Sequence, residues 1–256
     1  MKLSIITVVL NQAATIKATI ESVLNQTWKE VEYLIIDGGS TDGTREIIET
    51  YGSRISIFLT EPDKGPYDAM NKGIKLATGD IVGMLNADDI YTSNRSLEKV
   101  AETFAKVNTD VTFSDIHFVN PPDWDQTVRY VSGRFFSPWQ LRYGFMPPHP
   151  TFFVRRELFD RYGCYKTDYR IAADYELIIR FLYTHRAVYK YLPVDLVRMR
   201  TGGRSTKSLH STLILNREIV RACRENGIYT NLPLLTLKYA IKIFQYMYLF
   251  PRNKPA

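Results

Sequence analysis

The fold is decided by an apolar run near the start of the chain, Leu3-Ser4-Ile5-Ile6-Thr7-Val8-Val9-Leu10, and by the segments that follow it. Apolar residues next recur at helical spacing, at Ile16, Ile20, Val23 and Leu24, and residues 31–36 form a second apolar run. A change of period from strand to helix and back predicts a β-α-β unit. The first run is too short for the apolar region of a signal peptide and lacks a small-residue cleavage site, so we expect a buried strand.

The same alternation continues to residue 85. Helical patterns cover residues 44–51 and 67–77, and strand patterns cover residues 55–59 and 81–85. Strands that alternate with helices of this length predict an α/β fold with a mostly parallel, Rossmann-like sheet flanked by helices. Such sheets bind their ligands at the carboxyl ends of the strands.

The alternation loosens after about residue 110. An aromatic-rich stretch, residues 130–153, precedes one clear helix at residues 173–183. Two amphipathic C-terminal helices are predicted over residues 208–226 and 233–250. In the second, Lys238 and Lys242 share one face and leave the other apolar, which suits either packing on the domain or an anionic membrane surface. We therefore divide the chain into residues 1–110, 111–205 and 206–256.

The net charge and the cysteine spacing limit the kinds of binding partner and cellular compartment that we expect. The chain has a net charge of +6, which favours anionic partners. This charge is not arranged with aromatic residues into a stripe, so we expect no nucleic-acid partner. Cys164 and Cys223 lack the paired spacing of a zinc or redox motif and fit a reduced, cytoplasmic compartment.

Three acidic clusters fall where a parallel sheet would gather them around one crevice. The first is Asp37-Gly38-Gly39-Ser40-Thr41-Asp42-Gly43, directly after the second strand. Its glycines permit tight turns, and Asp37 is placed to accept hydrogen bonds from a base or ribose. Asp42 is better explained as the cap of the next helix.

The second cluster, Asn86-Ala87-Asp88-Asp89, follows the strand at residues 81–85. Adjacent carboxylates at the end of a buried strand repel each other, and a divalent cation would neutralise them. Mg²⁺ or Mn²⁺ suits these oxygen ligands, and a nucleotide diphosphate would complete the coordination. The alternative is a solvated acidic loop. The chain has neither G-x-G-x-x-G nor G-x-x-x-x-G-K-[ST], so a metal ion would have to neutralise the phosphates.

The third cluster contains Asp174 at the start of the helix predicted at residues 173–183. Asp174 shares a helical face with Ile178 and Phe181, so its carboxylate should lean toward the interior or a cleft. Partial burial would raise its pKa and make it a better base. A helix N-cap explains the same residue equally well.

Together these residues resemble glycosyltransferase family 2, whose members are inverting enzymes with the GT-A fold. The resemblance rests on the order and spacing of five motifs over roughly the first 110 residues, and on a thinner match beyond them. The motifs are residues 7–11, Asp37 to Thr44, Glu61-Pro62-Asp63-Lys64-Gly65, Tyr67-Asp68-Ala69-Met70-Asn71-Lys72-Gly73 and Leu85 to Asp89. The later pieces are Pro148-His149-Pro150-Thr151, Ala173-Asp174 and Gly202-Gly203-Arg204-Ser205.

The resemblance implies roles for individual residues. Asp37 would contact the base, usually uracil, Asp88 and Asp89 would serve the metal and diphosphate, and Asp174 would be the general base. Many relatives have a carboxylate where this chain has Asn86, so Asn86 is expected on the ribose or donor sugar. Asp68 is a further donor-binding candidate, although an ion pair with Lys72 explains it equally well.

Other candidates carry weaker signals. Some relatives bring a late histidine to the metal, and His210 or His149 would be that residue, although an isolated histidine is more often structural. Lys64, Arg200 and Arg204 are candidates for phosphate binding, with a solvated basic face as the alternative.

The sequence thus predicts a metal-dependent inverting glycosyltransferase that uses a nucleotide-diphosphate sugar, with UDP as the expected nucleotide. Residues 1–110 would bind the donor, residues 111–205 would hold the acceptor and the base, and residues 206–256 would contact an anionic membrane surface. The resemblance implies a saccharide or lipid-linked saccharide acceptor and a role in surface polysaccharide assembly. The alternatives are a sugar nucleotidyltransferase and a non-catalytic binding module.

Overall fold

One nine-stranded sheet organises the molecule, which we describe from a computed structural model for residues 1–202 and 209–236. The strands are β1 (Leu3–Val9), β2 (Val31–Asp37), β3 (Ile57–Thr60), β4 (Ile81–Met84), β5 (Ile90–Tyr91), β6 (Val111–Asn120), β7 (Asp123–Val131), β8 (Phe153–Arg155) and β9 (Tyr189–Arg200). Their order is β3-β2-β1-β4-β8-β6-β9-β5, and β7 pairs with β6.

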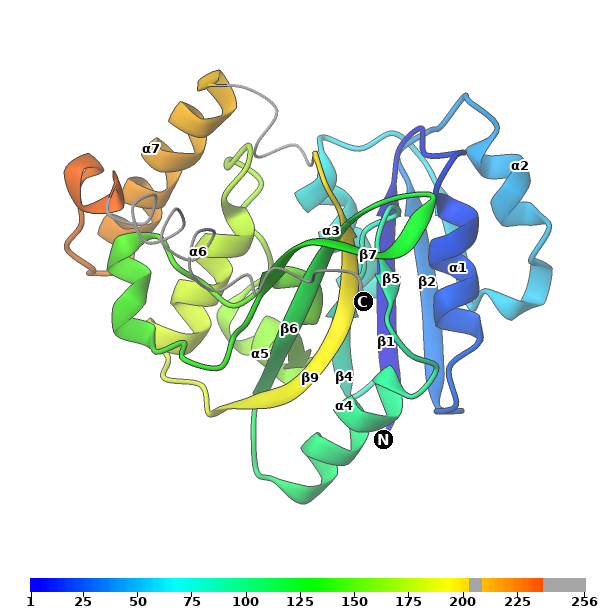
Figure 1. Ribbon diagram of the computed structural model, residues 1–256, viewed down its shortest axis with the longest axis horizontal. Coiled ribbons are helices and arrows are strands. Elements are labelled where there is room, and N and C mark those ends of the chain that lie inside the picture. Colours follow the sequence, from blue (N-terminus) through cyan, green and yellow to red (C-terminus); the bar gives the residue numbers. More distant parts are fainter. Residues whose placement is uncertain (203–208, 237–256) are drawn as a thin grey trace, which may run out of the picture.

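The predicted parallel sheet is its first half. β3, β2, β1 and β4 are parallel neighbours, so the carboxyl ends of β1, β2 and β4 meet at the upper edge in Figure 1. The second half is mixed: β8 is antiparallel to both β4 and β6, whereas β9 runs parallel to β6. The sequence pattern did not predict this half.

Helices cover both faces of the sheet. α1 (Ile16–Leu24), α2 (Thr44–Glu49) and α4 (Ser96–Lys106) supply buried side chains to one core cluster. α3 (Pro66–Leu76), α5 (Glu157–Tyr162), α6 (Ala173–Ile179) and α7 (Leu209–Glu225) supply the other. Alternate residues of β1 point into different clusters, Ile5 into the first and Ile6 into the second, as the period of a strand requires.

Close packing of α3 on β1 depends on Gly73. A Cβ atom at this position would lie 2.5 Å from Cγ2 of Ile6, so a larger residue would push the helix off the sheet. α3 begins soon after β3 ends, and its first turn therefore lies at the carboxyl edge of the parallel strands.

The remaining helical segments are short. They are the 3₁₀ turns Gly52–Arg54, Pro138–Tyr143 and His149–Thr151, and the π-helical turn Arg180–Thr184 that continues α6. The helix predicted at residues 173–183 is thus present but changes its hydrogen-bond pattern after Ile179. Of the helix predicted at residues 233–250, residues 232–236 are helical, and residues 237–250 lie outside the described part. Within the described ranges no helix has the length and apolar character needed to cross a membrane.

Candidate functional site

The acidic loop after β4 lies at the carboxyl edge of the parallel strands. Asp89 is 1% exposed, whereas Asp88 is half-buried. Nδ2 of Asn86 donates a hydrogen bond to Oδ2 of Asp89 at 2.7 Å, and the backbone N–H of Arg200 donates to Oδ1 at 3.3 Å. Asp88 is therefore the carboxylate that faces outward, and Asp89 ties the loop to the end of β9.

α1 fixes the backbone of the same loop. Oγ1 of Thr15 donates to the carbonyl of Ala87 at 2.9 Å, and Oγ1 of Thr19 donates to the carbonyl of Asp89 at 2.8 Å. Both threonines are buried, so these two hydrogen bonds are shielded from water. These two hydrogen bonds tie the backbone of the acidic loop to the N-terminal half of α1.

Burial and like charge make this carboxylate pair costly to ionise. Burial raises the pKa of Asp88, and the nearby charge of Arg200 opposes this rise. Burial and the adjacent charge of Asp88 raise the pKa of Asp89 well above its ordinary value. Within the described residues, no group of three or more His, Cys, Asp or Glu side chains is arranged to hold a metal ion. The pair still fits Mg²⁺ or Mn²⁺, because these ions often take only one or two carboxylates and complete their shell with water and phosphate.

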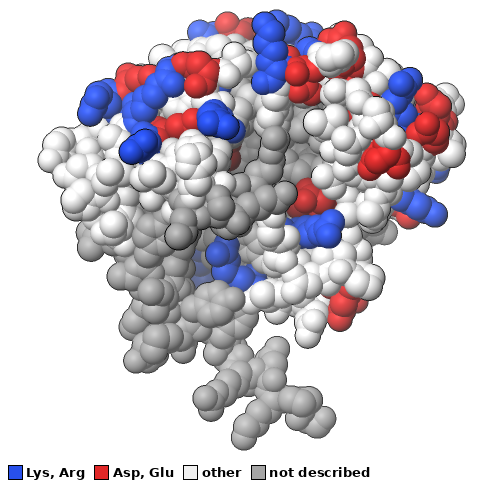
Figure 2. Space-filling view, turned by 90° about the horizontal axis from the view of Figure 1, so that it is seen from above, with Lys and Arg blue, Asp and Glu red and all other residues white. Residues whose placement is uncertain are grey.

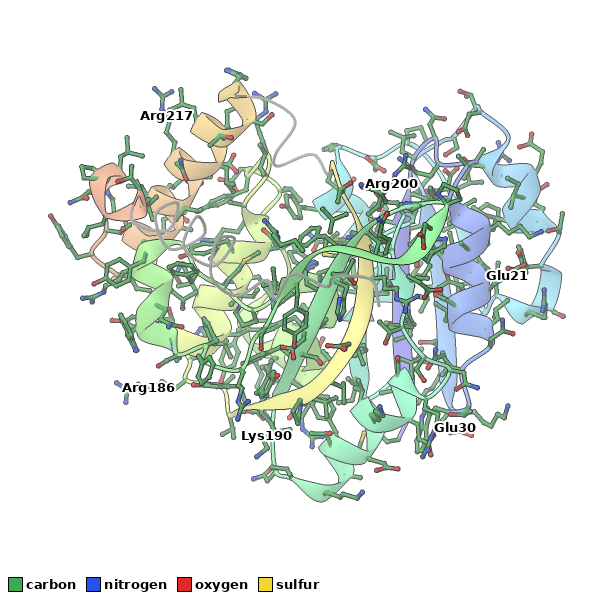
Figure 3. All side chains as sticks on the ribbon, in the orientation of Figure 1. Glu21, Glu30, Arg186, Lys190, Arg200 and Arg217 are labelled. Atoms are coloured by element: carbon green, nitrogen blue, oxygen red, sulfur yellow. The ribbon has the colours of Figure 1, made fainter. Side chains whose placement is uncertain are left out.

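Basic and acidic side chains share this edge of the molecule. Figure 2 looks onto it from above and shows lysines and arginines beside aspartates and glutamates on both sides of its centre. Arg200 is the last residue of β9, and its backbone N–H reaches the acidic loop at the upper edge of the molecule (Figure 3). Arg204, the other arginine predicted to bind phosphate, lies outside the described residues.

Asp37 ends β2 at the same edge, but its carboxylate faces inward. It is 0% exposed and accepts hydrogen bonds from Oγ of Ser40 (2.5 Å), Oγ1 of Thr60 (2.6 Å) and the backbone N–H groups of Gly39 and Ser40. Gly39 has a φ of 92°, a left-handed conformation that glycine adopts without steric cost, which explains why a glycine occupies this position. In this arrangement Asp37 shapes the turn, and its contact with a base stays a prediction.

Asp63 is a further candidate for the site. It stands in the motif Glu61-Pro62-Asp63-Lys64-Gly65, but its sequence pattern alone assigns it no role. Its Oδ1 accepts a hydrogen bond from the backbone N–H of Gly65 at 2.7 Å. Its Oδ2 lies over Gly38 and leaves no room there for a Cβ atom. The signal that could have found it is the glycine pair after Asp37, because a glycine often marks the close approach of another group.

Two other acidic residues have local structural roles. Asp42 accepts hydrogen bonds from the backbone N–H and Oγ1 of Thr44, at the start of α2, and from the backbone N–H of Ala13. The N-cap position of α2 is Gly43, so Asp42 is not itself the cap residue and instead accepts hydrogen bonds just before the helix begins. Asp68 accepts from the backbone N–H of Lys64 at 3.1 Å and lies 3.8 Å from Nζ of Lys72. The structure gives Asp68 an ion-pair role, and donor binding by Asp68 stays a prediction.

Asp174 is half-buried in the first turn of α6, beside the first turn of α3. Its Oδ1 accepts a hydrogen bond from the backbone N–H of Tyr175 at 2.8 Å and lies 3.5 Å from Oη of Tyr67. The N-cap of α6 is Ala172, so the alternative of an N-cap carboxylate does not hold. Burial raises the pKa of Asp174, as expected for a base, and the hydrogen bond from the backbone N–H of Tyr175 opposes this rise.

The two predicted histidine candidates lie in different surroundings. His149 is 9% exposed, and its Nε2 hydrogen-bonds Oη of Tyr165 at 2.7 Å. Burial lowers the pKa of His149, so the neutral ring is favoured. His210 is exposed at the start of α7 and is not grouped with Asp88 and Asp89 among the described residues.

Glu176, the acidic neighbour of Asp174, is fully buried in a network of ion pairs. Its carboxylate contacts Nη2 of Arg180 at 2.9 Å and Nζ of Lys166 at 3.1 Å. Lys166 also pairs with Glu225 of α7. Because both oxygens of Glu176 are engaged by cations, this residue joins α6 to α7 and is not a second base.

Comparison with known proteins gives a consistent picture. The chain matches the model of the glycosyl transferase family 2 over residues 4–163. It is 32% identical over 218 residues to a PGL/p-HBAD biosynthesis glycosyltransferase of Mycobacterium bovis, a match that covers 84% of this chain and 82% of that protein. It is 33% identical over 141 residues to WfgD of Escherichia coli, a UDP-Glc:alpha-D-GlcNAc-diphosphoundecaprenol beta-1,3-glucosyltransferase, covering 55% of this chain and 53% of WfgD.

Solved structures share the fold at low sequence identity. Residues 1–349 of S. aureus TarS in complex with UDP-GlcNAc align with a TM-score of 0.68 and 19% identity, over 99% of this chain and 74% of that one. The chain spans 44% of the longer TarS chain. The mannosyltransferase PcManGT from Pyrobaculum calidifontis, in complex with GDP-Man and Mn²⁺, aligns with a TM-score of 0.59 and 17% identity, over 96% and 80% of the two chains.

Proposed function

Because the chain belongs to glycosyl transferase family 2, we propose that it transfers a sugar, with inversion, from a UDP-sugar to a hydroxyl group. It is a glycosyltransferase, and its fold is the GT-A fold that the sequence resemblance implied. The proposal therefore concerns the donor, the acceptor, the metal and the residues that perform the transfer. We keep the division into a donor part (1–110), an acceptor part (111–205) and a C-terminal part (206–256).

The donor and acceptor are proposed from the chemistry of relatives. WfgD is named for a UDP-glucose donor and a lipid-diphosphate acceptor, and TarS has been solved with UDP-GlcNAc. These names support a UDP-sugar donor and a saccharide or lipid-linked saccharide acceptor for this chain. We further propose a role in surface polysaccharide or glycolipid synthesis and a cytoplasmic location.

The observation that carries the proposal is the pair of the half-buried Asp88 and the buried Asp89 at the carboxyl edge, with Asp174 held beside the first turn of α3 at the same edge. Asp88 and Asp89 would hold Mn²⁺ or Mg²⁺, which would neutralise charge on the diphosphate as it leaves. Asp88 presents the outward carboxylate, and Asp89 holds the loop through Asn86 and Arg200. Asn86 stays a candidate for the ribose or donor sugar.

Asp174 would act as general base in a single displacement. It takes the proton of the acceptor hydroxyl, the acceptor oxygen forms the new bond to the anomeric carbon, and the bond from that carbon to the diphosphate oxygen breaks. One displacement inverts the configuration. The raised pKa of Asp174 suits this role, because a base with a higher pKa accepts a proton more readily.

A panel of nucleotide sugars tests this function. We expect hydrolysis of one UDP-sugar that requires Mn²⁺ or Mg²⁺ and falls by ~10²- to 10⁴-fold in Asp174→Asn. Hydrolysis at the wild-type rate in Asp174→Asn would place the base elsewhere. Binding without turnover would support the binding module, and formation of a nucleotide sugar from a sugar phosphate would support the nucleotidyltransferase.

The C-terminal segment is proposed to contact an anionic membrane surface. The helix on which this depends, residues 233–250, lies mostly outside the described residues, so the support is its sequence pattern alone. Binding to vesicles that contain anionic lipid should weaken as salt rises, because the Debye length is ~10 Å at about 0.1 M salt. Leu235 is buried in the core cluster that also contains residues of α6 and α7, so the deletion should begin after it. Deletion from residue 237 onward should abolish vesicle binding and leave donor hydrolysis intact. Unfolding of the truncated protein would place the segment in the core.

A further inference from the structure

The backbone that leads into α6 is held from two sides by side chains of other helices. Residues 170–172 directly precede this helix, and Asp174 is its second residue. Ala172, at the N-cap position, has no side chain that could accept a hydrogen bond from the first turn. The position of Asp174 therefore depends on residues outside α6.

α3 holds this segment through Tyr67. The hydroxyl of Tyr67 donates a hydrogen bond to the carbonyl of Ile171, and its oxygen lies 3.5 Å from Oδ1 of Asp174. The ring is buried and stacks on Tyr165, with ring centroids 5.8 Å apart. One turn further along α3, the amide of Asn71 pairs with both the N–H and the carbonyl of Tyr165, at 2.9 and 2.8 Å.

α7 holds the same segment through Glu218. Oε1 of Glu218 accepts a hydrogen bond from the backbone N–H of Arg170 at 2.7 Å. Oε2 accepts from the N–H groups of Ile171 and Ala172, both at 2.9 Å. One carboxylate thus satisfies three successive backbone donors. Hydrogen bonds to a charged acceptor are stronger than neutral ones, so this contact fixes the backbone firmly.

We propose that Tyr67 and Glu218 are positioning residues that together set the carboxylate of Asp174 for proton transfer. The inference rests on the proposed role of Asp174 as the base. Tyr67 donates a hydrogen bond to a carbonyl of residues 170–172 and contacts Asp174 itself, while Glu218 accepts hydrogen bonds from the backbone N–H groups of the same residues. Tyr67 lies on the donor half of the chain, so the first turn of α3 joins the donor part to the base.

The test uses single-atom changes. Tyr67→Phe removes only the hydroxyl and keeps the stacked ring, and Glu218→Gln removes the charge and one acceptor. Because a small misplacement of a catalytic group is costly, each should lower kcat for hydrolysis of the UDP-sugar selected in the panel by about tenfold. The dissociation constant for UDP and the KM for the donor should stay within about twofold, since neither residue is assigned to the donor.

One matched control lies directly before the segment and the other lies on α7. Tyr169→Phe removes a hydroxyl that hydrogen-bonds Glu225. Glu225→Gln changes a carboxylate of α7 that pairs with Lys166 and Arg221. Both controls should keep kcat. A fall in kcat in the controls equal to that in Tyr67→Phe and Glu218→Gln would overturn the inference.

A double-mutant cycle with Asp174→Asn separates positioning from a general structural effect. If Tyr67 and Glu218 act through Asp174, their changes should lower the residual rate of Asp174→Asn by less than about twofold. An undiminished tenfold loss in that background, or a wild-type kcat in both single variants, overturns the inference. If Tyr67→Phe does not fold, Glu218→Gln carries the same test. Full activity of Asp174→Asn itself would instead refute the proposed base.

Discussion

Glu32 offers a sharp test of how the sheet beneath the site is held together. It lies in β2 opposite Ser4 of β1, at the end of the sheet away from the acidic loop. Its carboxylate accepts hydrogen bonds from Nζ of Lys2 (2.8 Å), Oγ of Ser4 (2.5 Å), and both the N–H (2.8 Å) and Oγ1 (2.6 Å) of Thr78. Burial alone would raise the pKa of Glu32, but these hydrogen bonds outweigh it and lower the pKa to about 2.

The size of the effect follows from linkage between protonation and folding. The fall from the ordinary value of 4.5 to about 2 is about 2.5 pKa units, and at 1.36 kcal/mol per unit this gives an upper limit of ~3.4 kcal/mol. Lys2 is 42% exposed, so water screens its contribution to the stabilisation. A glutamine at position 32 would also keep one acceptor oxygen. We therefore expect Glu32→Gln to lower the free energy of unfolding by about 2 kcal/mol near neutral pH.

The sign of the pH dependence is fixed by the direction of the shift. A lowered pKa gives stabilisation that is complete above 4.5 and is lost as the pH falls through about 2, so about half should remain near pH 3.3, midway between the two. Urea unfolding near neutral pH and near pH 3.3 measures this loss of stabilisation. Glu102→Gln, at a surface ion pair with Lys106, is the control and should change stability by less than about 0.5 kcal/mol. The reasoning is refuted if Glu32→Gln lowers the free energy of unfolding as little as Glu102→Gln does. It is also refuted if the destabilisation by Glu32→Gln is no smaller near pH 3.3 than near neutral pH.

Four further predictions concern the site and its support. Asp174→Asn should lower transfer by ~10²- to 10⁴-fold while calorimetry finds unchanged UDP affinity. Because burial raises the pKa of Asp174 and only the carboxylate accepts a proton, wild-type kcat should fall as the pH is lowered, with a midpoint above the ordinary value of about 3.9. A chelator should weaken UDP binding in the wild type, and Asp88→Asn should remove this sensitivity to the chelator. Gly73→Ala should destabilise the fold by about 1–3 kcal/mol in urea unfolding, because its Cβ would press on Ile6.

The sequence predicted the parallel half of the sheet because that half obeys local rules. β1, β2 and β3 are each an apolar run followed by a helix, β4 is a fourth such run, and parallel neighbours place the carboxyl ends of these strands together. That reasoning placed Asp37 and the Asp88-Asp89 pair at one edge before the fold was known. The helix that carries Asp174 was predicted from its spacing in the same way.

The mixed half could not be predicted, because it depends on pairings between distant segments. β8 has three residues, Phe153–Arg155, and lies antiparallel between β4 and β6, which is too short a run to show a period. β9 has twelve residues, but its burial does not alternate regularly, so no sequence pattern marks the face it presents.

The different surroundings of Asp88 and Asp89 follow from this second half. In the sequence the two are adjacent and chemically identical, and the strand-end rule places both at the same edge. The structure separates them because β9 ends beside the loop, where the N–H of Arg200 and the amide of Asn86 take up both oxygens of Asp89. A carboxylate in place of Asn86 would add a third negative charge and could not donate this hydrogen bond. Asn86 therefore keeps Asp89 facing inward, and Asp88 is left as the outward carboxylate.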